Sequence, residues 1–238
     1  MVRGPAALLT LLGVSVAYFL AAPSLPQIHP PELSAIVACS IGLALVVGIV
    51  SGLVAIADAP LALVPALVGA VLLVAVLDAG VGAAAVATPF ETVLYACAGI
   101  AFAVALETPL LAVGLPIFVA VIDIVAAGAG GGAGLFALST PHGGDALSLD
   151  LPDWGTGLAA ARLTAPDVVF LAAYATFARR LDLRERAAEA GMFAALLAAA
   201  AAEILFDAEV PALALLALGF LLPSVDRLPG LFAGLREG

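Results

Sequence analysis

The sequence predicts an all-α fold, a polytopic bundle of about eight transmembrane helices. Of the 238 residues, 64% are hydrophobic and 11% are charged, whereas soluble domains are about half apolar and about a quarter charged. The mean hydropathy is +1.23. The apolar residues also gather in runs near the roughly 20 residues that a helix needs to cross a bilayer. We therefore expect one integral membrane domain over residues 1–238, surrounded by the lipid bilayer.

Breaks between the apolar runs define the expected helices. They contain helix-ending residues, as in Pro23-Ser24-Leu25-Pro26 and Asp58-Ala59-Pro60. With boundaries loose by several residues, the helices are expected at residues 5–22, 34–57, 60–80, 90–106, 109–129, 163–180, 187–206 and 210–225. The first run follows Arg3 and could be taken for a signal peptide. Pro23 makes a poor cleavage site, however, and seven more runs follow, so a retained helix is favoured.

A long polar stretch separates the fifth and sixth expected helices. Residues 130–162 contain a run of glycines, three aspartates and Trp154. This composition predicts a flexible loop rather than a second domain. Helices one to four then occupy residues 1–107, and helices five to eight occupy residues 108–225.

The arginines predict the orientation of the chain in the membrane. Four of the eight lie in the short connection between helices six and seven: Arg179, Arg180, Arg184 and Arg186. The positive-inside rule places this connection in the cytoplasm. Both termini are then cytoplasmic and the 130–162 loop is external, an arrangement that every arginine except Arg162 supports. The expected location is the cell membrane, with a multi-pass topology.

Charge and motif content exclude several function classes. A net charge of −10, with eight arginines and no lysine, provides no clustered positive surface for nucleic acid. Cys39 and Cys97 lie in apolar runs, while His29 and His142 lie in loops without partners at ligand spacing, so no metal site is expected. The glycine run at 130–134 lacks the Lys-Ser/Thr of a phosphate loop, and no cofactor is expected.

Ionisable residues inside the spans are the candidate functional groups, because they are costly in lipid. Most acidic residues here lie at run edges, where solvated helix ends are predicted: Asp58, Glu91, Glu107, Asp207 and Glu209. Asp123 lies about six residues before the end of helix five, and Asp167 about five residues after the start of helix six. At a rise of 1.5 Å per residue, both lie roughly 8–9 Å below the outer ends of their helices. Antiparallel packing of helices five and six would bring the two carboxyl groups face to face. Their separation of 44 residues (167 − 123) makes the connecting loop long enough for this arrangement.

Two carboxyl groups at one depth suggest aspartic proteolysis. Close carboxyls cannot both ionise cheaply and therefore share a proton, so one can polarise a scissile carbonyl while the other activates water. The pair titrates as a unit. The alternative is a non-catalytic multi-span protein, either a transporter or a scaffold, whose Asp123 and Asp167 bind cations or relay protons.

Three short segments carry a family resemblance. Val121-Ile122-Asp123 looks like a helix bearing a Tyr-Asp motif, and Asp167-Val168-Val169-Phe170 like the start of a helix bearing Gly-x-Gly-Asp. Pro211-Ala212-Leu213 is similar to a Pro-Ala-Leu motif near the C-terminus. In this order and at this depth, over residues 110–225, they resemble the presenilin and signal peptide peptidase group of intramembrane aspartyl proteases.

The resemblance implies a site and a substrate class. Asp123 and Asp167 would be catalytic, Pro211, Ala212 and Leu213 would bind substrate, and the substrates would be transmembrane peptides. The C-terminal half would have a presenilin-like helix arrangement, oriented as in signal peptide peptidase. Ile122 stands in place of the family's tyrosine, and Thr164 and Pro166 stand in place of its two glycines. Ile122 stands beside the first aspartate, whereas Thr164 and Pro166 bear on the geometry around the second.

Overall fold

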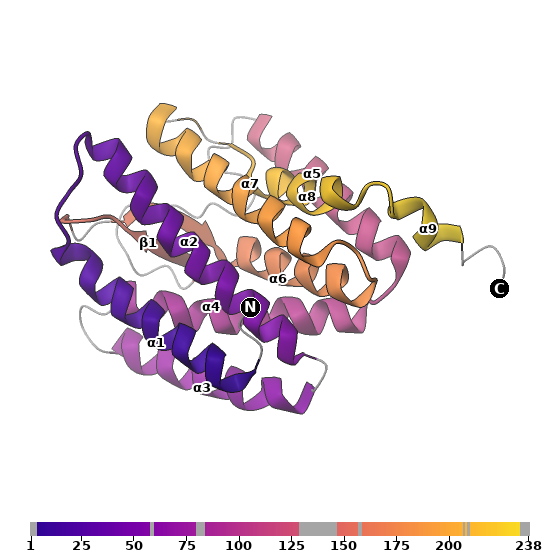
Figure 1. The fold of residues 1–238 in the computed structure, drawn as a ribbon, viewed down its shortest axis with the longest axis horizontal. Helices are drawn as coiled ribbons and strands as arrows, with labels where there is room; N and C mark the ends of the chain where they lie inside the picture. The colour runs from indigo at the N-terminus through magenta and orange to yellow at the C-terminus, as the bar shows by residue number, and fades with distance from the viewer. Residues whose placement is uncertain are drawn as a thin grey trace.

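The computed structural model describes residues 4–57, 60–79, 84–128, 147–156, 159–206, 208 and 210–233. The described chain is mostly helical (Figure 1). Its α-helices are α1 (Pro5–Ala21), α2 (Pro31–Ile56), α3 (Pro60–Ala79), α4 (Ala84–Ala105), α5 (Pro109–Gly128), α6 (Ala165–Arg180), α7 (Glu185–Phe206), α8 (Ala212–Leu221) and α9 (Leu228–Ala233). Two short 3₁₀ helices, η1 (Ala22–Ser24) and η2 (Leu222–Ser224), extend α1 and α8. Each of the eight predicted segments overlaps one of the helices α1 to α8, although α2, α4 and α7 begin three, six and two residues earlier than predicted. The prediction of a helical bundle is confirmed.

Five helices in the described part of the chain are long and apolar enough to cross a membrane: Pro5–Ser24, Pro31–Ile56, Ala87–Ala105, Pro109–Gly128 and Glu185–Phe206. They are the helices of a membrane protein. Helices α6, with 16 residues, and α8, with 10, are shorter than the usual bilayer-spanning helix. Both begin two residues later than the sequence predicts, because the chain ahead of each is extended.

Proline sets where several helices begin. Helices α1, α2, α3 and α5 each have proline as their first residue. Proline suits this position because its fixed φ is already helical and its missing N–H would have no partner within the helix. Prolines in the breaks between apolar runs therefore mark helix starts as well as helix ends.

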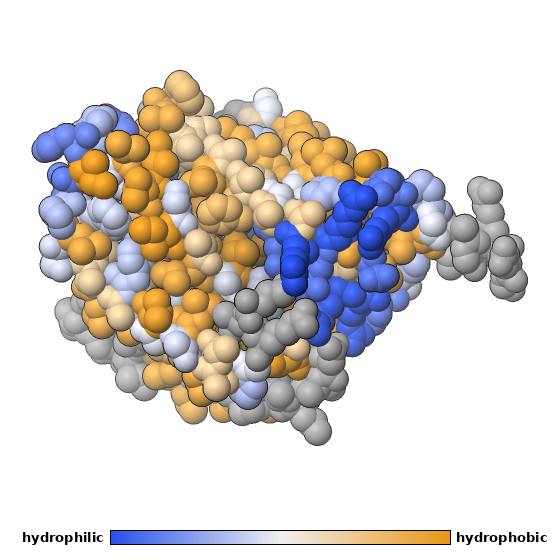
Figure 2. Space-filling model, in the orientation of Figure 1, coloured by the Kyte–Doolittle hydropathy of each residue, from blue (hydrophilic) through white to orange (hydrophobic). Residues whose placement is uncertain are grey.

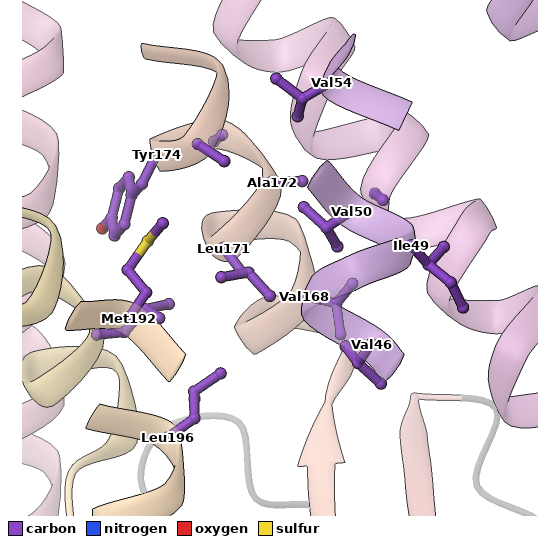
Figure 3. Close-up of a cluster of buried hydrophobic side chains, with 14 of the residues drawn as sticks. Val46, Ile49, Val50, Val54, Val168, Leu171, Ala172, Tyr174, Met192 and Leu196 are labelled. Carbon is purple, nitrogen blue, oxygen red and sulfur yellow. The ribbon is translucent and has the colours of Figure 1, made fainter. Parts of the chain in front are cut away.

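Helix α6 is the central helix of the bundle. Eleven of its residues are buried, and it contacts α2, α4, α7 and α8. Figure 3 shows the valines of α2 on one side of Val168 and Leu171, with Met192 and Leu196 of α7 on the other. Against α4 the two backbones touch, since a Cβ on Gly99 would lie 2.1 Å from the carbonyl oxygen of Val169. Only glycine permits that approach.

Helix α5 lies at the periphery. Its outward face exposes large apolar side chains, as a lipid-facing surface would: Leu110, Ile117, Phe118, Val121, Ile124 and Val125. Its inward face is a helical stripe of Ala112, Pro116, Val119 and Asp123, and its main contact is with α8. Apolar residues cover most of the middle of the face shown in Figure 2, with the larger hydrophilic patch on the right and a smaller one at the upper left. Asp123 therefore points away from the lipid-facing side and into the bundle.

The stretch predicted as a flexible loop contains a buried β-hairpin, so the loop prediction is wrong for this part. Strands β1 (Ser148–Pro152) and β2 (Ala159–Thr164) pair antiparallel, with Asp150 opposite Arg162. The side chains of Leu149 and Leu151 are fully buried, and β1 contacts α2 and α4. The reason is the alternation of leucine with polar residues in Ser148-Leu149-Asp150-Leu151, which gives a strand one apolar face.

The hairpin lies at the end of the bundle where α1 ends and α4 begins, here called the hairpin end. The indole Nε1 of Trp154 donates to the Tyr18 hydroxyl at 3.2 Å, and the amide of Gly155 donates to the Ala22 carbonyl at 3.3 Å. Thr88 donates its hydroxyl to the carbonyl of Asp150 at 3.1 Å. These bonds fix the hairpin to helices from the first half of the chain.

The arginine end, defined by Arg179, Arg180, Arg184 and Arg227, lies where α6 meets α7, and corresponds to the larger hydrophilic patch in Figure 2. Its ion pairs connect segments that are distant in sequence. Arg180 pairs with Glu107, which lies between α4 and α5, and Arg184 pairs with Asp226 at 2.8 Å. Arg227 donates to the carbonyl of Asp182 at 2.7 Å.

Arg162, the arginine that did not fit the predicted orientation, lies at the hairpin end. Its Nε donates to the Asp150 carboxylate at 2.8 Å across the two strands. Its charge is therefore matched locally by an acidic residue. Arg179, Arg180 and Arg184 at the opposite end are also paired with acidic residues, so Arg162 still disagrees with the predicted orientation.

Candidate active site

Asp123 lies on the inward stripe of α5, with 5% of its surface exposed. The backbone amide of Ala214 donates to its Oδ2 at 3.1 Å, and the backbone of Leu213 also hydrogen-bonds to the carboxyl. Both amides belong to the first turn of α8, where N–H groups have no acceptor within the helix. The side chain of Asp123 therefore caps the N-terminus of a helix 91 positions further along the chain.

Asp167 is the third residue of α6, with 6% of its surface exposed. The backbone amide of Thr164 donates to its Oδ2 at 2.7 Å, and the Thr164 hydroxyl donates to the same oxygen at 2.8 Å. Thr164 and Asp167 thus form the capping box that starts α6. The helix begins at 165 rather than at the predicted 163 because β2 continues to Thr164.

Both carboxyl groups lie inside the bundle toward the hairpin end, on helices that contact each other. Helix α5 meets α6 through far fewer residues than it meets α8. An electrostatic interaction with Asp123 acts on Asp167, but it is a smaller influence than the burial of Asp167 and its hydrogen bonds to Thr164. The structure therefore places Asp123 and Asp167 in the same region of the bundle, on neighbouring helices.

The third motif borders the same place. Pro211 is the N-cap of α8 and is extended, with φ −64° and ψ 94°. Ala212 is the first residue of α8, and the backbone of Leu213 touches the Asp123 carboxyl. Pro211, Ala212 and Leu213 thus lie against one of the two aspartates. The second Pro-Ala-Leu copy in the sequence, at residues 65–67, lies within α3.

Non-helical backbone lies on two sides of the carboxyl pair. Thr164, ahead of α6, is extended with φ −91° and ψ 156°, as is Pro211 ahead of α8. Irregular backbone at membrane depth is tolerated where it is buried in protein or lines a polar cavity. Extended chain also carries N–H and C=O groups that can pair with another extended segment.

Comparison of the chain with family models, with curated proteins and with solved structures finds no match. The resemblance to intramembrane aspartyl proteases therefore depends on three short motifs and on where the fold places them. Within the described residues, no group of three His, Cys, Asp or Glu side chains could hold a metal ion.

The sequence did not predict the environment of two residues near the hairpin end, Glu91 and Thr164. Glu91 was expected at a solvated helix end, but only 7% of its surface is exposed. Helix α4 begins at Ala84 and continues through Pro89, so Glu91 lies two turns inside it. Thr164 was considered only as a departure from a glycine motif, whereas it supplies both hydrogen bonds to Asp167. The signal for it was the Thr-x-x-acid pattern of a capping box.

Proposed function

We propose that the protein is an intramembrane aspartyl protease that cleaves transmembrane helices with Asp123 and Asp167. One observation carries the proposal: two buried aspartates lie on neighbouring helices toward the same end of the bundle, and one of them touches the Pro-Ala-Leu segment. An unpaired buried carboxylate is costly, and clusters of such groups concentrate at functional sites. The order of the three motifs in the chain supports the same proposal.

In the proposed reaction the two carboxyl groups share one proton. The ionised carboxyl takes a proton from water as the water oxygen attacks the scissile carbonyl carbon, and the protonated carboxyl gives its proton to the carbonyl oxygen. When the resulting diol collapses, the C–N bond breaks, the leaving nitrogen takes the proton from the carboxyl that water had protonated, and a diol hydroxyl gives its proton to the other carboxylate. The products are a carboxylic acid and an amine, and the shared proton is restored.

Substrate binding is assigned to the chain ahead of α8. Pro211, Ala212 and Leu213 include extended backbone beside Asp123, where an unwound segment of a transmembrane helix could align for cleavage. Proline has no N–H, so one fewer donor must be satisfied when the segment is unoccupied. The expected partners are transmembrane peptide substrates within the lipid bilayer, and neither nucleic acid nor a cofactor takes part.

The proposed topology has eight spans in the cell membrane, with a presenilin-like arrangement of α5 to α8 in the C-terminal half. The arginine end faces the cytoplasm together with both termini, and the hairpin end faces outward. The clustering of Arg179, Arg180 and Arg184 at one end supports this orientation. The carboxyl pair then lies near the outer side of the membrane.

A second candidate function is a non-catalytic membrane protein, either a scaffold or a transporter. It is favoured by the hydrogen bonds themselves, because each aspartate already caps the N-terminus of a helix. Capping alone would account for both residues without any chemistry. The two candidates differ in what happens when a carboxyl group is replaced by an amide.

The test is cleavage of a transmembrane substrate by protein reconstituted in liposomes. Asp123→Asn and Asp167→Asn should each lower kcat by at least about 10²-fold, since asparagine cannot exchange the proton. Thermal stability should change little, because the amide oxygen still accepts the capping hydrogen bonds. Asp226→Asn, at the opposite end of the molecule, is the matched control and should retain full activity. Cleavage that persists in both Asp123→Asn and Asp167→Asn would exclude the proposal.

A further inference from the structure

We propose that Thr164 is the positioning residue of Asp167: it holds Oδ2 with two hydrogen bonds and leaves Oδ1 for the shared proton. The inference rests on the proposed function and concerns how the same site is made competent. Thr164 would not touch the substrate. It would act through the carboxyl group that it orients.

The geometry of the two hydrogen bonds is the first argument. The amide and the hydroxyl of one residue both donate to Oδ2, at 2.7 and 2.8 Å. Two donors on one oxygen select a single orientation of the carboxyl plane, and hydrogen bonds to a charged acceptor are the strong ones. Both of these hydrogen bonds are made to Oδ2 and neither to Oδ1. The two oxygens are therefore inequivalent before any substrate binds.

Burial is the second argument. Asp167 is among the buried polar residues and lies in the first turn of the most enclosed helix of the bundle. Water has little access with which to replace a lost donor. A carboxyl deprived of the Thr164 hydroxyl would keep one hydrogen bond instead of two, and it would be freer to rotate.

The third argument is that Thr164 is itself held. It is the last residue of β2 and pairs with Ser148 in the hairpin. The next amide, that of Ala165, donates to the carbonyl of Leu147 at 2.7 Å. The donors that orient Asp167 thus belong to a strand rather than to a mobile loop, and supporting groups on regular elements hold a site more accurately.

The replaced motif residues are the fourth argument. A glycine at 164 could offer its amide to Asp167 but has no hydroxyl. Pro166, at the second position of α6, offers no amide at all. The hydroxyl of Thr164 is therefore a donor that glycine could not provide. Pro166, in the same turn, lacks the amide donor that another residue would have.

Asp123 is held in a comparable way from a different element. The amide of Ala214 donates to its Oδ2 at 3.1 Å, and its other contact is with the backbone of Leu213. Each carboxyl of the pair is thus fixed by neighbouring donors rather than by the other carboxyl. Pre-set orientation of both groups is what a shared-proton mechanism requires.

The experiment compares Thr164→Val, Thr164→Ser and Thr176→Val in liposomes. Valine keeps the amide and the shape but removes the hydroxyl, whereas serine keeps both donors. Thr176→Val is the matched control, because the hydroxyl of Thr176 donates to the carbonyl of Ala172 at 2.7 Å within the same helix. Active sites are counted by titration with a hydroxyl-containing transition-state analogue, so that kcat refers to folded sites only.

The expected result is a kcat about 10- to 100-fold lower in Thr164→Val with KM unchanged, the effect of losing one hydrogen bond to a charged group in the chemical step. Thr164→Ser should remain within about threefold of the wild type, and Thr176→Val should match the wild type. A loss of stability alone would reduce the number of titrated sites without changing kcat per site. Equal kcat in Thr164→Val and Thr176→Val would overturn the inference. If Thr164→Val gives no titratable sites, Thr164→Ala is judged by the same criterion.

A second readout separates this inference from the proposed function. With ¹³C-carboxyl aspartate, the Asp167 resonance is the one lost in Asp167→Asn. It should move in Thr164→Val and stay in place in Thr176→Val, whether or not a substrate is cut. An unmoved resonance overturns the positioning role even if proteolysis is established. The resonance could also move while Asp123→Asn and Asp167→Asn leave cleavage intact. The proposed function then fails. Thr164 is in that case a helix cap only, and the inference is overturned as well.

Discussion

Buried aspartates need partners, and those of Asp123 and Asp167 are donors at helix N-termini. Asp123 accepts from the first turn of α8, and Asp167 accepts from Thr164 at the start of α6. Burying a polar group without a hydrogen bond is unfavourable. The same bonds that make the two residues tolerable in the bundle also fix where their carboxyl groups point.

A stability prediction follows for Asp123. Asp123→Leu should destabilise the protein by about 1–3 kcal/mol relative to Asp123→Asn, because leucine leaves the buried amide of Ala214 without an acceptor. Unfolding of the two variants in detergent micelles, followed by circular dichroism, measures the difference. Equal stability would mean that this hydrogen bond does not anchor α8.

At the scale of elements, helices α7 and α8 cross where two glycines meet. A Cβ on Gly191 would lie 2.2 Å from the carbonyl oxygen of Gly219, and a Cβ on Gly219 would lie 2.5 Å from that of Gly191. Small residues allow such close contact between helices in lipid, where packing contributes more than the hydrophobic effect. This crossing holds α8 in place, and with it the segment beside Asp123.

Gly191→Ala should therefore lower the free energy of unfolding by about 1–3 kcal/mol, since the added methyl group forces the backbones apart. Gly114→Ala is the control, because a Cβ at Gly114 meets nothing within 4 Å. The control should be neutral or up to about 1 kcal/mol more stable, as alanine favours the helix. Denaturation midpoints of both variants check this, and a neutral Gly191→Ala would show that the helices can separate at no cost.

The β-hairpin is the second element on which the site depends, because β2 leads directly into α6. Leu149 is 0% exposed, whereas Leu147, two residues earlier, is 47% exposed. Leu149→Ala should cost about 2–5 kcal/mol of stability, the range for emptying a packed leucine site. Leu147→Ala should cost far less. If the two variants unfold alike, the hairpin is not part of the folded core.

At the scale of the whole molecule, its two ends differ in charge. The arginine end carries Arg179, Arg180 and Arg184, each with an acidic partner. The hairpin end contains the buried carboxyl pair, with Arg162 matched by Asp150. In the proposed topology the arginine end is the one that faces the cytoplasm.

Labelling of single cysteines tests that orientation. The background variant is Cys39→Ala with Cys97→Ala, both native cysteines being buried. Thr156→Cys, at the exposed tip of the hairpin, should react with a membrane-impermeant maleimide in intact cells. Asp226→Cys, at the arginine end, should react only after permeabilisation, and its ion pair is exposed enough for the substitution to cost little. The reverse labelling pattern would invert the proposed topology.

The helical class, the order of helices α1 to α8 and the placement of Asp123 and Asp167 near the ends of their helices could all be predicted from the sequence. These features follow from the lengths of apolar runs and from breaks in them, which are local properties of the chain. Even the hairpin had a local signal, the alternation around Leu149, although the polar composition of residues 130–162 obscured it.

The atoms that hold the two carboxyl groups could not be predicted from the sequence, because they depend on how distant segments pack. The donor to Asp123 lies 91 residues away in the chain, and the extended segments ahead of α6 and α8 shorten both helices at the site. The burial of Glu91 also depends on where α4 begins. Helix α4 continues through Pro89, a residue that usually marks a helix start or end. Such features arise from contacts between distant segments, where packing and hydrogen-bond satisfaction override local preference, and a one-dimensional pattern does not contain them.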